Sequence, residues 1–358
     1  MDGILHLSPK QRLELFEQTA QQTGMDAVIL EKDFWVCWTL KELFRLPTIG
    51  EHLIFKGGTS LSKVFKVIER LSEDIDVSID RGWLGFGGAN EPEAGGSNKE
   101  KQRRIEALRV ACQQKIAAEL LPALKAAIKA KVHQGDPWTL RVDDEDPDQQ
   151  TLLFDYPTGF APDATGYIRR MVKIEMGARA DHWPCEAKTV TPYVAEQFPQ
   201  GFKEPSGEVK VLSAERTFWE KATILHAEFH RPADKPMPDR FSRHYCDFYE
   251  LVRKGVAKSA IAKPELLIAR WTACIVCLRR SARRKKLMNW IGKRRSCSAS
   301  SSTSRRGMRS ARRQARPSRA SQWRGSNPGA KLWTPHPLNA QGSAVRELIA
   351  AWPEDSAP

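Results

Sequence analysis

The feature that most constrains this chain is a pair of adjacent glycines followed, after a helix-length spacer, by two aspartates one residue apart. The glycines are Gly57 and Gly58, and the aspartates are Asp74 and Asp76. Adjacent glycines let backbone N–H groups approach a phosphate closely. Alternate residues of a strand share one face, so the two aspartates should project together while their apolar neighbours face a core. Either half alone is common as a plain turn or a surface pair. Together they favour a phosphate cradle beside a Mg²⁺ site, a layout that suits phosphoryl or nucleotidyl transfer.

A third carboxylate normally completes such a site, and Glu175 is the best candidate. It lies in an alternating segment in which Ile174 and Met176 should face inward and Glu175 the opposite side. The alternative is an exposed strand glutamate paired with Arg179 or Lys173. Both interpretations are open from the residues alone.

These segments carry a resemblance to a known family. A Gly-Gly turn followed by Asp-x-Asp resembles the signature of the polymerase-β-like nucleotidyltransferase superfamily. More narrowly, residues 55–61 and 70–76 resemble the AbiEii/AbiGii-type toxin family of nucleotidyltransferases. Three later segments, residues 173–179, 215–222 and 242–247, occur in the same order as in the family. The resemblance runs from about Leu7 to about Lys258.

The resemblance implies an α+β fold with a polymerase-β-like core, a mixed sheet, flanking helices and a helical C-terminal part. It predicts an N-terminal helical segment (residues 1–50), a nucleotidyltransferase core (51–205) and a helical domain that completes the site (206–274). The resemblance would call for a further helical segment after these, but the composition of residues 275–358 marks an Arg/Ser-rich tail instead. The implied activity is Mg²⁺-dependent transfer of a nucleotide from a nucleoside triphosphate, ATP or GTP among them, to an acceptor hydroxyl. The acceptor implied is RNA, with tRNA the expected kind. The protein would act as the toxin of a bacterial toxin–antitoxin or phage-defence system, beside a cognate antitoxin of the transcriptional-regulator type.

The resemblance also assigns roles to single residues. Asp74, Asp76 and Glu175 would hold metal, and the two aspartates would be catalytic. The nucleotide would be bound by a larger set: Gly57, Gly58, Thr59, Ser60, Arg70, Ser72 and Lys221.

Two catalytic assignments come from the later segments. Lys221 would reach the triphosphate from a helix, although a lone helical lysine is usually solvated. Asp247 would be a catalytic or positioning carboxylate, including a base for the acceptor hydroxyl. The alternative for Asp247 is a helical ion pair with Arg243, four residues earlier.

The net charge of +14 does not by itself indicate a nucleic-acid partner. From Ile275 onward the chain holds 19 Lys and Arg but 3 Asp and Glu, so the preceding residues hold 38 basic and 40 acidic side chains. The tail is rich in Arg, Ser, Ala and Pro and lacks hydrophobic periodicity, which predicts disorder. It is either a basic RNA-binding arm or, as we favour, the product of a reading-frame change near residues 259–280.

Local patterns predict the elements. Helices are expected at 8–22, 26–44, 60–69, 99–134 with a break or kink at Pro122, 213–230 and 239–253. Strands are expected at 53–55, 74–79, 139–142, 152–155 and 167–176, and the stretch from about 209 to 258 is expected to be helical. No apolar run is long enough to cross a membrane, and seven scattered cysteines predict a reduced, cytoplasmic protein.

Two functions from different classes follow. The first is the nucleotidyltransferase just described. The second is a non-catalytic or decayed nucleotide- or RNA-binding protein with a damaged C-terminus. Intact motif carboxylates favour the first, and the abnormal tail favours the second.

Overall fold

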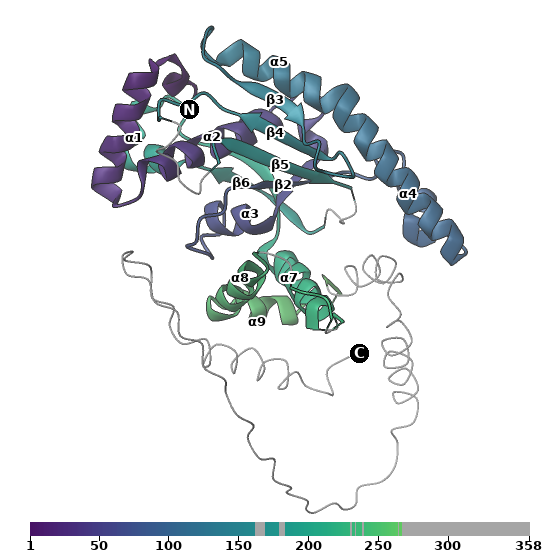
Figure 1. Ribbon diagram of the computed structural model, residues 1–358. Coiled ribbons are helices and arrows are strands. Elements are labelled where there is room, and N and C mark those ends of the chain that lie inside the picture. Colours follow the sequence, from purple (N-terminus) through teal and green to yellow (C-terminus); the bar gives the residue numbers. More distant parts are fainter. Residues whose placement is uncertain are drawn as a thin grey trace, which may run out of the picture. The chain divides into compact units, whose positions relative to one another are not determined.

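A seven-stranded mixed sheet organises the protein in the computed structural model (Figure 1). The structure describes residues 1–161, 169–178, 183–229, 231–232, 234–237, 240–263 and 265–266. The strand order is β3-β4-β5-β2-β1-β7-β6. The strands are β1 (Leu53–Lys56), β2 (Ile75–Ile79), β3 (Thr139–Val142), β4 (Thr151–Asp155), β5 (Met171–Gly177), β6 (Cys185–Val190) and β7 (Gly207–Leu212). The α+β class and the mixed sheet with flanking helices are therefore confirmed.

The sheet centre pairs segments that are far apart in the sequence. β1 runs antiparallel to β2 and parallel to β7, while β2 runs parallel to β5. Ile75, Val77 and Ile79 of β2 are fully buried, as the alternation predicts. Their intervening residues therefore emerge on the opposite face, where the predicted site lies.

Two helices open the chain, and both begin where their capping residues predict. α1 (Pro9–Thr23) has Ser8 as its N-cap in a capping box and ends at Gly24 in the left-handed region. α2 (Ala27–Phe44) begins after Asp26, whose side chain accepts the N–H of Val28. α2 packs on β5, β6 and β7, and its aromatic side chains are buried in the main core.

The predicted long helix is present with a defect just before Pro122. It comprises α4 (Asn98–Lys115), a π-helical turn (Ile116–Leu120) and α5 (Leu121–Lys131). Proline lacks an N–H and its ring collides with the carbonyl four residues earlier, so the preceding turn widens. The kink predicted at Pro122 is thus accommodated within one continuous helical stretch.

The last described helices form a second core with the segment that follows the glycine turn. They are α7 (Ala214–Phe229), α8 (Ser242–Arg253) and α9 (Val256–Ile261), which lie beside α3 in Figure 1. Phe218 stacks on Phe248, and both pack with Leu61, Val67 and Ile68. This core fixes α7 and α8 against the chain between β1 and β2.

Three expectations differ from the structure. The helix expected at 60–69 is α3 (Gly57–Lys63), which starts at the glycine pair and ends before Val64. The stretch from about 209 to 258, expected to be helical, begins with strand β7 (Gly207–Leu212), which pairs with β1. β6 and the short α6 (Tyr193–Gln197) were not predicted at all.

Other expectations fall partly outside the described residues. Residues 82–97 hold two 3₁₀ turns, Gly88–Asn90 and Pro92–Ala94. The tail at 275–358 and the beginning of the strand predicted at 167–176 lie outside the described residues, and the proposed domain boundaries stay predictions. No helix among the described residues is long and apolar enough to cross a membrane.

Candidate active site

Strand pairing places the three predicted carboxylates together. Asp76 of β2 is the direct partner of Glu175 on β5 and of Lys56 on β1. Asp74 comes one residue before β2, two positions from Asp76 on the same side. A row of charged residues thus crosses three neighbouring strands at the level where the chain leaves β1 for the glycine turn.

Burial, together with the charges of neighbouring carboxylates, raises the pKa values of the two aspartates. Burial is the largest cause for Asp76, whose pKa rises to about 6 although the nearby positive charge of Lys56 opposes the shift. Burial and the charge of Glu175 also raise the pKa of Asp74. A bound cation would relieve both effects, because it offsets the carboxylate charge.

The glycine pair lies against these groups with no room for side chains. Gly57 has a φ of +81°, and a Cβ there would fall 1.9 Å from Oδ2 of Asp76. A Cβ on Gly58 would fall 2.8 Å from Oγ of Ser72 and 2.9 Å from Nη2 of Arg70. A side chain at Gly58 would require Ser72 and Arg70 to shift, whereas Gly57 is required both by space and by its backbone conformation.

The two hydroxyls after the glycines bond to the protein itself. Thr59 donates to the carbonyl of Asp74 and contacts Oγ of Ser72 at 3.0 Å. Ser60 Oγ donates to the carbonyl of Gly57 at 2.8 Å. Both side chains are fully buried. Thr59 holds the turn against the start of β2 and Ser60 closes the turn on itself, whereas their predicted contact with nucleotide stays a prediction.

Asp247 is the centre of a buried charge cluster. Both of its carboxylate oxygens accept from Arg70, at 2.7 Å from Nε and 2.8 Å from Nη2. Lys221 Nζ on α7 donates to Oδ2 at 2.8 Å and lies 3.3 Å from Nδ1 of His244. The Asp247 side chain is 0% exposed. The cluster joins α7, α8 and the loop before β2, which brings together three of the predicted segments.

The surroundings fix the charges within this cluster. Burial alone would raise the pKa of Asp247, but the hydrogen bonds from Arg70 and the charge of Lys221 outweigh it, so its pKa is lowered. Burial and the charge of Lys221 lower the pKa of His244 to about 4, which leaves its ring neutral near pH 7. Asp247 therefore stays ionised between two cations.

The ion pair considered for Arg243 and Asp247 is not the arrangement found. Arg243 Nη1 lies 3.9 Å from Oδ2 of Asp74 instead, so α8 directs one cation toward the carboxylate row. The alternative for Glu175 is partly realised, since Lys173 Nζ lies 2.6 Å from its Oε1. Arg179, the other partner considered, lies outside the described residues.

The donor set fits a hard divalent cation in its chemistry. Asp74, Asp76 and Glu175 offer carboxylate oxygens, which Mg²⁺ prefers. In the part of the chain that the structure describes, no three His, Cys, Asp or Glu side chains are gathered closely enough to hold a metal as they stand. The Glu175 carboxylate is paired with Lys173. To bind a metal together with Asp76, the Glu175 side chain would have to turn away from Lys173.

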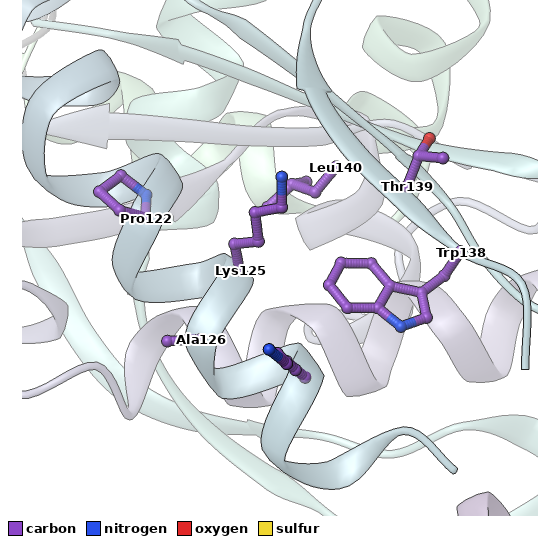
Figure 2. A pocket seen from close by; sticks show the side chains of 7 residues that line it. Pro122, Lys125, Ala126, Trp138, Thr139 and Leu140 are labelled. Carbon is purple, nitrogen blue, oxygen red and sulfur yellow. The ribbon is translucent and has the colours of Figure 1, made fainter. Parts of the chain in front are cut away.

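Two residues near the site were not predicted as members. Lys56 pairs with Asp76 across the strands, and its position directly before Gly57 was the available signal. His244 contacts Lys221, and it lies within the 242–247 segment. A pocket elsewhere, between α5 and β3, is lined by Lys125, Trp138, Leu140 and their neighbours and by none of the predicted site residues (Figure 2).

Comparison with known proteins gives three findings. A search of curated proteins gives no match. Among solved structures, MenT4, a nucleotidyltransferase toxin from Mycobacterium tuberculosis H37Rv, is 16% identical, with a TM-score of 0.35. That match covers 61% of this chain and 59% of that one.

The third finding is a family match over residues 38–320. It begins later than the expected resemblance over 7–258, and it extends into the basic tail. With the glycine pair, the carboxylate row and the Asp247 cluster in place, and with that family model matching residues 38–320, the chain belongs to the AbiEii family of nucleotidyl transferase toxins of type IV toxin–antitoxin systems.

Proposed function

We propose that the protein transfers a nucleotide from a nucleoside triphosphate to a hydroxyl of RNA, with tRNA as the expected acceptor and Mg²⁺ as the metal. In this reaction the acceptor oxygen bonds to the α-phosphorus, the bond to the bridging oxygen breaks, and pyrophosphate leaves. The hydroxyl proton passes to water or to a carboxylate of the site.

The chain's own residues would act mainly by position and charge. Gly57 and Gly58 let Asp76 and Arg70 approach the turn closely, and Asp74, Asp76 and Glu175 would hold the metal. When bound, Mg²⁺ supplies charge neutralisation at the phosphates. Lys221 and Arg70 carry the positive charge on the other side of the turn. Both are held by Asp247, whose burial and lowered pKa favour a positioning role over that of a base.

One observation carries this proposal. Asp76 lies against Gly57, with its Oδ2 where a side chain would be, and Nη2 of Arg70 lies 2.9 Å from the equivalent point on Gly58. The glycine pair therefore separates an acidic group from a basic one across the width of two residues. A triphosphate with its metal would satisfy both sides.

The test is transfer of labelled nucleotide to total tRNA with each of the four triphosphates in turn. The full-length protein should label RNA with at least one of them, and Asp76→Asn should not. Asp80→Asn is a matched control, since Asp80 follows the same strand but its side chain caps the next turn by accepting from the N–H of Gly82 at 2.8 Å. Labelling by Asp76→Asn at the unmodified rate would contradict the mechanism.

The toxin role and a cognate antitoxin of the transcriptional-regulator type belong to the same proposal, as does a cytoplasmic site of action in phage defence. Induced expression should arrest growth, and Asp76→Asn should relieve the arrest. Binding of nucleotide without transfer to any RNA would instead favour the second function, a decayed nucleotide- or RNA-binding protein. The reading-frame change near residues 259–280 stays a prediction.

A further inference from the structure

Lys32 is a buried cation that bonds to both segments that carry the proposed metal ligands. It lies on α2, is 3% exposed, and donates through Nζ to Oε2 of Glu73 at 2.6 Å. The same Nζ donates to the backbone carbonyl of Arg169 at 2.9 Å. Glu73 directly precedes Asp74, and Arg169 lies two residues before β5, which carries Glu175. One ammonium group therefore joins the two segments that supply the proposed metal ligands.

A buried ion pair is weak evidence of a stabilising role, because desolvation offsets most of the Coulomb attraction. The protein has a comparable pair away from the site: Arg12 Nη1 lies 2.7 Å from Oδ2 of Asp136, with side chains 2% and 8% exposed. Lys32 differs from Arg12 in that its partners, Glu73 and the Arg169 carbonyl, belong to the segments that carry Asp74 and Glu175. Glu73 has a second, longer contact, 3.9 Å from Nη2 of Arg240, so Lys32 provides its short, buried attachment.

We propose that Lys32 is a positioning residue that acts through Glu73 and the Arg169 carbonyl to set the spacing of Asp74 and Glu175 for a divalent cation. This inference rests on the proposed function for the identity of the ligands. Partners of ligating residues that hold them in place are worth roughly 10–100-fold in metal affinity or activity.

If Lys32 acted only through its charge, the Lys32→Met variant would change cation affinity in the opposite direction. Lys32→Met leaves the negative charge of Glu73 uncompensated near the site. If Lys32 acted through charge alone, the variant would bind a cation more tightly. If it sets geometry, the variant binds more weakly.

The experiment measures binding of Mn²⁺ alone to the full-length protein, from the electron paramagnetic resonance signal of free Mn²⁺. Lys32→Met should raise the Kd about tenfold or more. The double variant Lys32→Met/Glu73→Gln keeps the net charge and removes both buried charges, which favours folding. It should also bind at least about tenfold more weakly. Arg12→Met is the matched control and should leave the Kd unchanged.

Each result decides the question. Tighter binding by Lys32→Met, or unchanged binding by the double variant, overturns the positioning role. Weaker binding by both, with Arg12→Met unaffected, supports it. A wild-type protein that binds Mn²⁺ but transfers no nucleotide overturns the proposed function and leaves the positioning role standing. A wild-type protein that binds no Mn²⁺ overturns the positioning role, and the transfer assay decides the proposed function separately.

Discussion

Gly57 meets two demands at once, a positive φ and the absence of a side chain where Asp76 approaches. Many turn glycines have a positive φ, whereas the close approach of a proposed metal ligand is specific to this site. A methyl group at Gly57 would force either the turn or the Asp76 carboxylate to move. Since displacement of about 1 Å can cost about 100-fold in rate, the geometry makes Gly57 sensitive out of proportion to its size.

Gly57→Ala should therefore reduce nucleotide transfer at least about 100-fold. Gly255→Ala is the control for backbone strain alone, because Gly255 has a φ of +82° and nothing within 4 Å of a Cβ. Gly255→Ala should lose roughly 1–2 kcal/mol of folding free energy from backbone strain alone, and Gly57→Ala should lose more because of the contact with Asp76; urea unfolding measures both. Equal transfer rates for the two variants would show that the contact with Asp76 does not matter.

Asp76 should make cation binding depend on pH in a known direction. Its pKa is raised to about 6, so below that value the carboxyl is increasingly protonated and cannot bind a cation. Mn²⁺ affinity should rise with pH by up to about tenfold per unit below about 6 and level off above it. Asp76→Asn should bind weakly and flatten this part of the profile. A wild-type profile that is flat between about pH 5 and 7 would argue that the ionisation of Asp76 does not limit binding.

At the scale of elements, Asp247 links parts of the chain that no local interaction would bring together. Arg70 precedes it by 177 residues and Lys221 by 26. The carboxylate holds α7, α8 and the loop before β2 around one buried point. Its removal leaves two cations facing each other with no anion between them.

Asp247→Asn should lower the free energy of unfolding by roughly 3–5 kcal/mol, as for other broken buried ion pairs, and should abolish transfer. Glu250→Gln on the same helix is the control, because its partner Arg253 is 51% exposed. That variant should unfold and react like the wild-type protein. If Asp247→Asn were as stable as the control, the cluster would not fasten the three elements.

Lys221→Met separates the two roles of the cluster. It removes the cation that faces the proposed triphosphate but leaves the Arg70–Asp247 pair intact. Transfer should fall strongly, while the loss in unfolding free energy stays smaller than in Asp247→Asn. A full rate in Lys221→Met would assign the transfer chemistry to other residues.

Over the whole described molecule, the main core gathers around the aromatic residues of α2. Trp35 is fully buried; its ring contacts those of Phe34, Trp38 and Phe154 edge-on and stacks on Tyr156 at 5.5 Å. This cluster joins α2 to β4 and the residue after it. The same helix carries Lys32, so the core and the proposed metal ligands share one support.

Trp35→Ala should cost about 3–5 kcal/mol in unfolding free energy, because it leaves a cavity in a close-packed core. Met237→Ala, at a side chain that is 55% exposed, should change it by no more than about 0.5 kcal/mol. Chemical denaturation followed by tryptophan fluorescence and circular dichroism would measure both. Comparable losses in the two variants would contradict the position of this core.

The sequence by itself determined the features that depend on neighbouring residues. The caps of α1 and α2, the inward side chains of β2, the turn at Gly57 and the shared face of Asp74 and Asp76 all follow from spacing of a few residues. β7 carried the same kind of signal, since Val209 and Val211 alternate with Glu208 and Lys210. It went unrecognised because the helix that follows it dominates the local pattern.

Only the tertiary structure decided which distant segments meet. In the folded chain Glu175 pairs with Asp76 across the strands, and β7 lies next to β1. Asp247 bonds to Arg70 and Lys221, whereas Arg243 lies near Asp74. It also revealed Lys32 beneath both carboxylate segments. Local periodicity fixes which way a side chain faces along its own element. The partner that it meets is fixed by how strands and helices bury their apolar faces together, which depends on the whole chain at once.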